Sequence, residues 1–156
     1  MKFVIDTNVA VVANGRNTHA DLQCQIACIE KLESITNRHT LAIDDKGLIF
    51  QEYQKHLNFN GQPGTGDIFF KYLFYNQHNK RKVFTCTITP VEDPRKGFSE
   101  LPDNDLDSSD RKFLAVSVAS NATIINATDS DWSEQAFLLR KLGVKVNQLC
   151  PQYATK

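Results

Sequence analysis

Five acidic residues stand where they could act together on a divalent cation. Asp6 directly follows an apolar run, Asp129 and Asp131 follow another, Asp110 opens an amphipathic segment and Glu52 lies within one. Carboxylates held close together raise each other's pKa unless a cation lies between them. Oxygen ligands without histidine suit Mg²⁺ or Mn²⁺. Because one or two such ions can polarise a phosphoryl oxygen and activate water, the pattern points to phosphodiester hydrolysis.

The segments that must position these acids alternate between short apolar runs and amphipathic stretches. Strands are predicted at residues 3–5, 41–43, 83–88, 122–126 and 144–146. Helices are predicted from residue 7 to 14, and at residues 20–35, 46–56, 67–76, 110–120 and 131–142. Helical crossovers between strands imply an α/β fold, with a mostly parallel sheet of about five strands flanked by helices. Ligands bind such folds at the carboxyl ends of the strands, where the acids are therefore expected to meet.

Helix capping is the competing interpretation for several of the acids. Asp6, Asp110 and Asp131 could each cap the first turn of a helix, and Glu52 alone could be an ordinary solvated residue. Other acids are interpreted as caps or loop residues, with Asp107 as the reserve candidate for the site: Asp44, Asp45, Asp103, Asp105 and Asp107.

Two predicted helices have marked apolar faces. In residues 20–35 the spacing of Leu22, Ile26, Ile29 and Leu32 predicts a buried stripe. Residues 67–76 carry five aromatic side chains, which could stack on bases or pack in a core. Core packing is the favoured interpretation.

The four cysteines suggest neither a zinc site nor disulfides. Cys24 and Cys28 share a helix face, Cys86 and Cys150 stand alone, and no Cys-x-x-Cys pair occurs. They are expected to be small buried apolar residues in a reducing compartment.

Three segments together resemble the PIN-domain (PilT N-terminus) nucleases. These are Val4-Ile5-Asp6-Thr7-Asn8-Val9, residues 110–119 with Asp110 before an alanine-containing helix, and Thr123-Ile124-Ile125-Asn126-Ala127-Thr128-Asp129-Ser130-Asp131-Trp132. They follow the family's order along the whole chain. The resemblance implies a single PIN-like nuclease domain over residues 1–156, with a three-layer α/β/α architecture.

The resemblance also implies roles for individual residues. Asp6, Asp110 and Asp129 match the family's metal-binding aspartates, Glu52 its central glutamate and Asp131 an additional acid. Thr7 and Asn8 match polar residues that would orient Asp6 or a bound water. The family further implies Mg²⁺- or Mn²⁺-dependent cleavage of RNA, frequent dimers and, for toxin-type (VapC-like) members, an antitoxin partner.

The charge distribution is compatible with a polyanionic substrate. The 18 basic and 18 acidic residues balance, but 13 acidic residues face 18 basic ones once the five site acids are set aside. Lys and Arg side chains supply most of the non-specific affinity for nucleic acids. Arg111, Lys112 and the run Lys80-Arg81-Lys82 are the candidate RNA contacts, with an Arg111–Asp107 ion pair as the alternative for Arg111. Residues 92–110 hold seven acids, in a loop expected to shape substrate choice or contact a partner.

Several function classes remain beside a toxin-type endoribonuclease. They are a free-standing RNA-processing or phage-defence nuclease, a DNA-directed nuclease, and a catalytically weak module that binds RNA or protein. A haloacid-type phosphatase is disfavoured because Asn8 stands where that chemistry needs a second Asp. With 156 residues, 41% hydrophobic and 23% charged, the composition is that of a globular protein. No apolar run is long enough for a membrane span and no signal peptide is evident, so the expected compartment is the cytoplasm.

Overall fold

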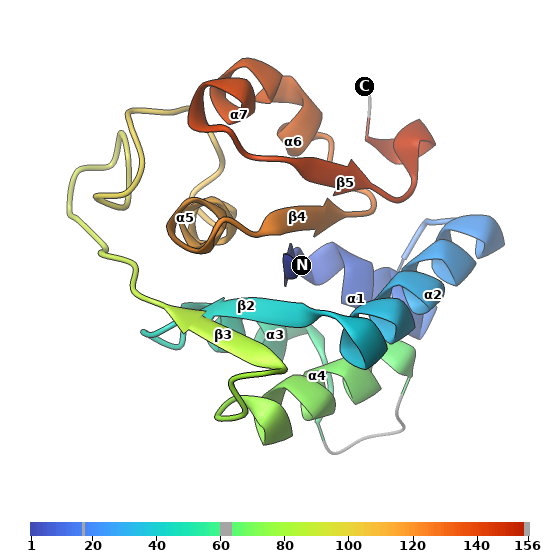
Figure 1. Cartoon of the computed structure of the whole chain (residues 1–156). Coiled ribbons are helices and arrows are strands. Elements are labelled where there is room, and N and C mark those ends of the chain that lie inside the picture. The colour runs from blue at the N-terminus through green and yellow to red at the C-terminus, as the bar shows by residue number, and fades with distance from the viewer. Residues whose placement is uncertain (17, 60–63, 155–156) are drawn as a thin grey trace.

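The computed structural model of the chain describes residues 1–16, 18–59 and 64–154. A five-stranded sheet with the order β3-β2-β1-β4-β5 forms its centre, and all its neighbouring strands are parallel (Figure 1). The strands are β1 (Lys2–Ile5), β2 (Thr40–Asp44), β3 (Val83–Cys86), β4 (Thr123–Asn126) and β5 (Val146–Gln148). The predicted α/β class with a parallel sheet is confirmed.

Helices form the crossovers between these strands and flank the sheet. They are α1 (Thr7–Asn14), α2 (Leu22–Arg38), α3 (Leu48–His56), α4 (Thr65–Asn76), α5 (Arg111–Ser120), α6 (Asp131–Glu134) and α7 (Ala136–Leu142), followed by the 3-10 helix η1 (Pro151–Tyr153). Helix α5 packs against β1, β2, β3 and β4, whereas α2 and α3 contact β2. Within the described residues, no helix combines the length and apolarity that crossing a membrane requires.

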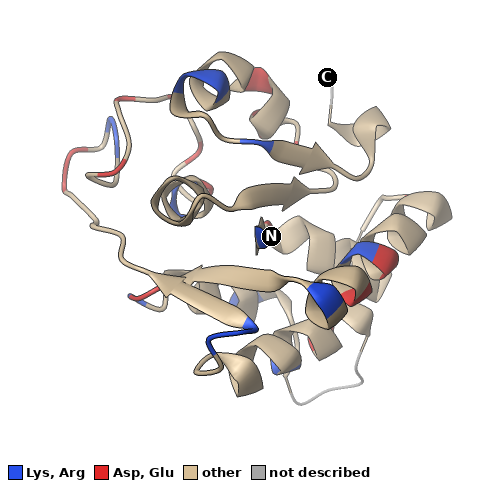
Figure 2. Cartoon of the chain, viewed as in Figure 1, with Lys and Arg blue, Asp and Glu red and all other residues tan. Residues whose placement is uncertain are grey.

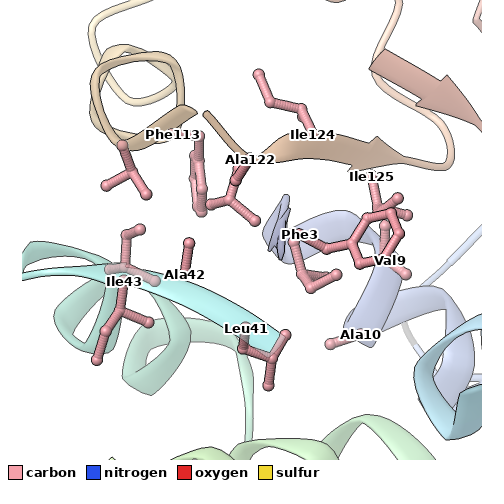
Figure 3. Close-up of a cluster of buried hydrophobic side chains, with 14 of the residues drawn as sticks. Phe3, Val9, Ala10, Leu41, Ala42, Ile43, Phe113, Ala122, Ile124 and Ile125 are labelled. Atoms are coloured by element: carbon pink, nitrogen blue, oxygen red, sulfur yellow. The ribbon is translucent and has the colours of Figure 1, made fainter. Parts of the chain in front are cut away.

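The core lies where helices cover the central strands. Val4, Ile5, Ile124 and Ile125 are buried, as expected for parallel strands covered on both faces. Figure 3 shows side chains of β1, β2 and β4 gathered with Val9 and Ala10 of α1 and with Phe113 of α5. This packing fixes the strand ends from which the candidate site is built.

Tyr53 connects α3 to the end of β1. Its buried hydroxyl donates a hydrogen bond of 2.5 Å to the carbonyl oxygen of Ile5, the residue before Asp6. The Tyr53 ring also contacts Phe69 and Phe70 of α4 and Phe113 of α5, with centroids 5.7 to 6.4 Å apart. The aromatic residues of α4 thus contribute to the core as predicted, although Phe74 and Tyr75 are exposed.

The predicted apolar face of α2 is confirmed at Leu32 and wrong at Leu22 and Ile26. Leu32 is buried, whereas Leu22 is 68% exposed and Ile26 44% exposed, and Cys24, Cys28 and Ile35 complete the buried face. The helix begins where the Asp21 side chain accepts a hydrogen bond from the Cys24 amide, which sets the turn that faces inward. The small side chains of Cys24 and Cys28 therefore lie on the buried face of the helix, where the prediction placed the larger side chains of Leu22 and Ile26.

Two cysteine predictions are corrected by the structure. Cys24 and Cys150, predicted to be unpaired, form a disulfide that joins the start of α2 to the segment after β5. The pairing depends on the fold, because 126 residues separate the two cysteines while their Cα atoms lie 5.5 Å apart. Cys28 and Cys86 are free and buried, as predicted.

The last predicted elements also change. The helix predicted at residues 131–142 is two helices, α6 and α7, with Gln135 between them. The strand predicted at 144–146 begins at Val146, two residues later. Both changes leave Asp131 at the first position of a short helix beside the strand ends.

Candidate metal centre

Three aspartates from distant parts of the chain meet at the carboxyl edge of the sheet. Asp6 follows β1, Asp129 follows β4, and Asp110 immediately precedes α5. One carboxylate oxygen from each of them lies within 4.8 Å of the other two. We call Asp6, Asp110 and Asp129 the acid triad.

Capping does not account for the positions of Asp6 and Asp110. They occupy the N-cap positions of α1 and α5, but neither side chain makes a capping hydrogen bond. The backbone N–H of Asn8 is near enough to lower the pKa of the Asp6 carboxyl, but it does not form a capping hydrogen bond with it. Asp44 shows the contrast, because its carboxylate accepts hydrogen bonds from the amides of Lys46, Leu48 and Ile49 at the start of α3, as a predicted cap. The side chains of the triad are thus available to a ligand.

Burial and repulsion between carboxylates raise the pKa values of Asp6 and Asp110. Burial is the largest cause for Asp6, whose pKa rises to about 6, although a hydrogen bond from Trp132 opposes the shift and the charge of Asp129 adds to it. The pKa of Asp110 lies well above its ordinary value because of burial, the charges of Asp6 and Asp129, and a hydrogen bond with Asp129. A cation among these oxygens would favour the ionised forms.

The donor set fits a hard divalent cation. Among the described residues, no Lys, Arg or His forms an ion pair with a member of the triad. The hydroxyl oxygen of Thr7, next to Asp6, is buried and has no hydrogen-bond partner in the described part of the chain. Three carboxylates and a hydroxyl are oxygen donors of the kind that Mg²⁺ and Mn²⁺ take.

Trp132 holds Asp6 in place and was not among the predicted site residues. Its indole N–H donates a hydrogen bond of 2.7 Å to Oδ2 of Asp6, and its side chain is fully buried at the first turn of α6. The sequence contained a signal, since an aromatic residue follows Asp131 in the segment that resembles the PIN family. The position of Trp132 in the sequence does not indicate that its indole hydrogen-bonds to Asp6.

Asn8 links the two strand ends that carry Asp6 and Asp129. Its side-chain oxygen accepts hydrogen bonds from the amides of Ala127 and Thr128, and its amide donates to the side chain of Asn126. The Asn126 amide in turn donates to the backbone carbonyl of Asp129. Asn8 therefore supports the turn that carries Asp129, whereas the sequence prediction gave it a role at Asp6 or a bound water.

Glu52 and Asp131 lie outside the triad. The charge of Glu52 is a minor cause of the raised pKa of Asp6. Its carboxylate pairs with basic side chains, at 3.4 Å from Lys112 and 3.6 Å from His56. The backbone amide of Asp131 donates to Oδ1 of Asp129 at 2.9 Å, so this residue orients a triad carboxylate through its main chain.

Arg111 is hydrogen-bonded to the long acidic loop. Its guanidinium donates hydrogen bonds to the backbone carbonyls of Pro94, Asn104 and Leu106 and to the side chain of Asn104. Its donors are thus engaged by the loop of residues 92–110 in this structure, and a contact of Arg111 with RNA stays a prediction. Among the described residues Arg111 forms no ion pair with Asp107, whose carboxylate accepts hydrogen bonds from Ser109.

The basic run Lys80-Arg81-Lys82 lies at the other edge of the sheet. It immediately precedes β3, and the backbone carbonyls of Arg81 and Lys82 accept hydrogen bonds from Thr40 and Leu41 at the start of β2. Figure 2 shows this basic segment leading into β3. Because the strands are parallel, the run is separated from the triad by the length of the strands. Of the predicted RNA contacts, Lys112 is the one that the structure places beside the triad.

Comparisons with known proteins find similarity in structure. No protein-family model and no curated protein sequence matches the chain. A PilT N-terminus domain protein of the archaeon Sulfolobus solfataricus is 12% identical, with 99% of this chain and 91% of that one covered and a TM-score of 0.46. VapBC2 of Rickettsia felis, bound to a DNA fragment from its promoter, is 14% identical, with 95% and 98% covered and a TM-score of 0.47.

Proposed function

We propose that residues 1–156 act as one PIN-like nuclease domain that hydrolyses phosphodiester bonds of RNA with the help of one or two Mg²⁺ or Mn²⁺ ions. The observation that carries the proposal is the acid triad, in which three carboxylates meet at the ligand-binding edge of a parallel sheet without a basic partner among the described residues. Repulsion within such a group is costly unless a cation or a shared proton relieves it. A site of this kind is suited to the charge that develops on a phosphodiester.

Each residue of the site has a task in this proposal. Asp6, Asp110 and Asp129 would hold the ion, which when bound would polarise the phosphoryl oxygens and lower the pKa of a water molecule. Trp132 keeps Asp6 in one orientation through its indole N–H. The Asp131 amide and Asn8 hold Asp129 and its turn. These contacts prearrange the carboxylates, so that little reorganisation is needed when a substrate arrives.

RNA cleavage tests the proposal directly. A labelled single-stranded RNA is incubated with the wild type and with Asp110→Asn, each with Mn²⁺, with Mg²⁺ or with a chelator. We expect cleavage that needs the metal and falls about 100-fold or more in the variant, since even residues that only support metal ligands alter activity 10- to 100-fold. Asp105→Asn is the matched control, because it removes an exposed carboxylate from the neighbouring loop.

Two results would contradict the proposal, and a third would widen its substrate class. Cleavage that persists in Asp110→Asn would show that the triad is not the active site. RNA binding without cleavage under any metal condition would favour the alternative of a binding module. A DNA strand of the same sequence, cut as fast as the RNA, would extend the substrate to DNA, since no group identified at the site recognises a 2′-hydroxyl.

The biological setting stays a prediction. A toxin of a toxin–antitoxin pair should arrest growth when expressed, and Asp110→Asn should abolish that arrest. Co-expression with its antitoxin should restore growth and yield a complex of the two proteins. A processing or defence nuclease should cut its RNA without such arrest, and sedimentation would show whether the chain forms the expected homodimer.

A further inference from the structure

Glu52 gathers three basic side chains beside the acid triad. Its carboxylate lies 3.4 Å from Nζ of Lys112, 3.7 Å from Nζ of Lys55 and 3.6 Å from Nε2 of His56. Two lysines exceed the charge of one glutamate even when the histidine is neutral. The cluster is therefore a positively charged feature next to an acidic site.

The cluster borders two adjoining hollows of the surface. One, with a volume of about 180 Å³, is lined by Glu52, Lys55, Lys112 and Ser108 among others. The second, about 330 Å³, is lined by Lys55, His56, Arg16 and residues at the end of α1. Lys55 borders both hollows, and we call the two together the α3 groove.

One end of the α3 groove lies next to Asp110 of the triad. Ser108 and Lys112, which line the groove, stand two residues before and two residues after Asp110, and Lys112 lies on the first turn of α5. From there the groove follows the last turn of α3 toward the end of α1, where Arg16 pairs with the buried carboxylate of Asp67. The basic residues of the groove therefore extend from the site in one direction, toward the end of α1.

The other approaches to the triad are less suited to a polyanion. The loop of residues 92–110 carries the exposed carboxylates of Asp103, Asp105 and Asp107. The run at residues 80–82 is basic, but it lies at the opposite edge of the sheet. Of these three surfaces, the α3 groove is the one that offers basic side chains next to a member of the triad.

We propose that the α3 groove binds the phosphates next to the cleaved bond of a single-stranded polynucleotide, with Lys55 and Lys112 as the contacts. This inference rests on the proposed nuclease function. An ammonium group has three donors, and Lys112 directs its own toward Glu52 and the carbonyl of Ser109, at 2.6 Å, so its position is fixed before a phosphate arrives. Lys55 is 70% exposed in its side chain and can turn toward a bound strand. Glu52 is then a positioning residue for these cations.

The salt dependence of RNA binding tests this inference without relying on cleavage. In the Asp110→Asn background, Lys55→Met with Lys112→Met is compared with Lys80→Met with Lys82→Met. Both pairs remove two charges and keep the apolar stems, and circular dichroism of each variant checks that it is folded. Affinity for a fluorescent single-stranded RNA is measured by anisotropy over a series of salt concentrations.

We expect the two pairs to differ. Each lost phosphate contact reduces the slope of log affinity against log salt by about 0.7 for single strands, so the α3-groove pair should lose about 1.4. The pair at residues 80 and 82 should keep the slope of the parent. In the cleaving protein, the α3-groove pair should raise KM and leave kcat within about twofold, because uniform binding is lost.

The outcomes separate this inference from the proposed function. If the wild type cuts RNA with metal but both pairs keep the parental slope, the α3 groove is wrong and the nuclease stands. If the pair at residues 80 and 82 loses the slope instead, the strand crosses the opposite edge and the α3 groove is again wrong. If the wild type neither cuts nor binds RNA, both proposals fail.

Discussion

Trp132 shows how one side chain prepares the carboxylate on which the site depends. A hydrogen bond from a neutral N–H to a carboxylate is stronger than one between neutral groups, and here both partners are buried. We expect Trp132→Phe to reduce metal-dependent cleavage about 10- to 100-fold, because loss of a contact that orients a ligand typically costs that much. A higher Mn²⁺ requirement and unchanged RNA affinity should accompany the loss.

A double-mutant cycle on unfolding checks that this effect acts through Asp6. Trp132→Phe, Asp6→Ala and the double variant are unfolded with denaturant under metal-free conditions. The indole hydrogen bond should appear as a coupling energy of about 1.5–3 kcal/mol between the two positions. Additive effects of the two substitutions, or full activity of Trp132→Phe, would show that the contact has no positioning role.

Whether the role of a site residue could be predicted from the sequence depended on how far along the chain its partners lie. Asp6, Asp110 and Asp129 each border a strand or helix, so local patterns place them at the edge where ligands bind. The indole of Trp132 bonds to a residue 126 positions away. The guanidinium of Arg111 is used by loop carbonyls that no periodicity places. Such contacts follow from tertiary packing and have no local signature.

At the scale of elements, the C-terminal segment is joined to α2. The Cys24–Cys150 disulfide, a hydrogen bond from the Asp21 amide to the Tyr153 hydroxyl, and a contact between the rings of His19 and Tyr153 hold it there. Ser133 of α6 also bonds to the carbonyl of Ala154. The segment therefore supports the short helix from which Trp132 reaches Asp6.

Removing the disulfide should destabilise the fold without removing the triad. We expect Cys150→Ser to lower the free energy of unfolding by about 2–5 kcal/mol under non-reducing conditions, because the crosslink restricts the unfolded chain. A reductant should destabilise the wild type and leave Cys150→Ser unchanged, which makes the reduced wild type the matched control. Equal stability of the wild type with and without reductant would mean that the disulfide does not contribute.

The same region shows why helix α2 was predicted but not its orientation. Its length and its amphipathic spacing are local properties, so the helix could be placed to within a few residues. Which face is buried depends on what packs against it. Cys24 and Cys28 are small residues that are buried beside the neighbouring C-terminal segment. Leu22 and Ile26 have no such neighbour and remain exposed.

At the scale of the whole molecule, topology decides which charges can cooperate. The alternation of strands and helices was sufficient to predict a parallel sheet, and with it the convergence of acids from three segments. Charge composition carries no such spatial information. The run at residues 80–82 and Lys112 looked equivalent in the sequence, yet the sheet places them at opposite edges. The direction of the strands therefore decides which basic residues lie on the candidate path of the RNA, whereas the number of basic residues does not.

The raised pKa values of Asp6 and Asp110 should make the metal-free fold less stable at higher pH. Asp6 and Asp110 bind protons more tightly in the folded chain than in the unfolded one, so the folded state holds more protons between their ordinary pKa of 3.8 and their raised values. The free energy of unfolding then falls as pH rises through this range. For Asp67 and Asp107 the pKa is lowered, so their contribution is complete above about pH 5 and does not oppose the trend at pH 6 to 8.

Denaturant unfolding of the wild type and Asp110→Asn in a chelator, at pH 5 and pH 8, measures this effect. The variant should be more stable than the wild type at pH 8, with a difference that shrinks toward pH 5. The wild type must take up a proton at Asp110 when it folds at the higher pH, and asparagine does not. Mn²⁺ at about 100 times its dissociation constant should stabilise the wild type at pH 8 by about 2.7 kcal/mol and the variant by less. Asp105→Asn, at an exposed carboxylate, should match the wild type in all conditions. A wild type that is more stable than Asp110→Asn at pH 8 without metal would show that the carboxylates do not repel one another, and the reason for expecting a cation at the triad would be lost.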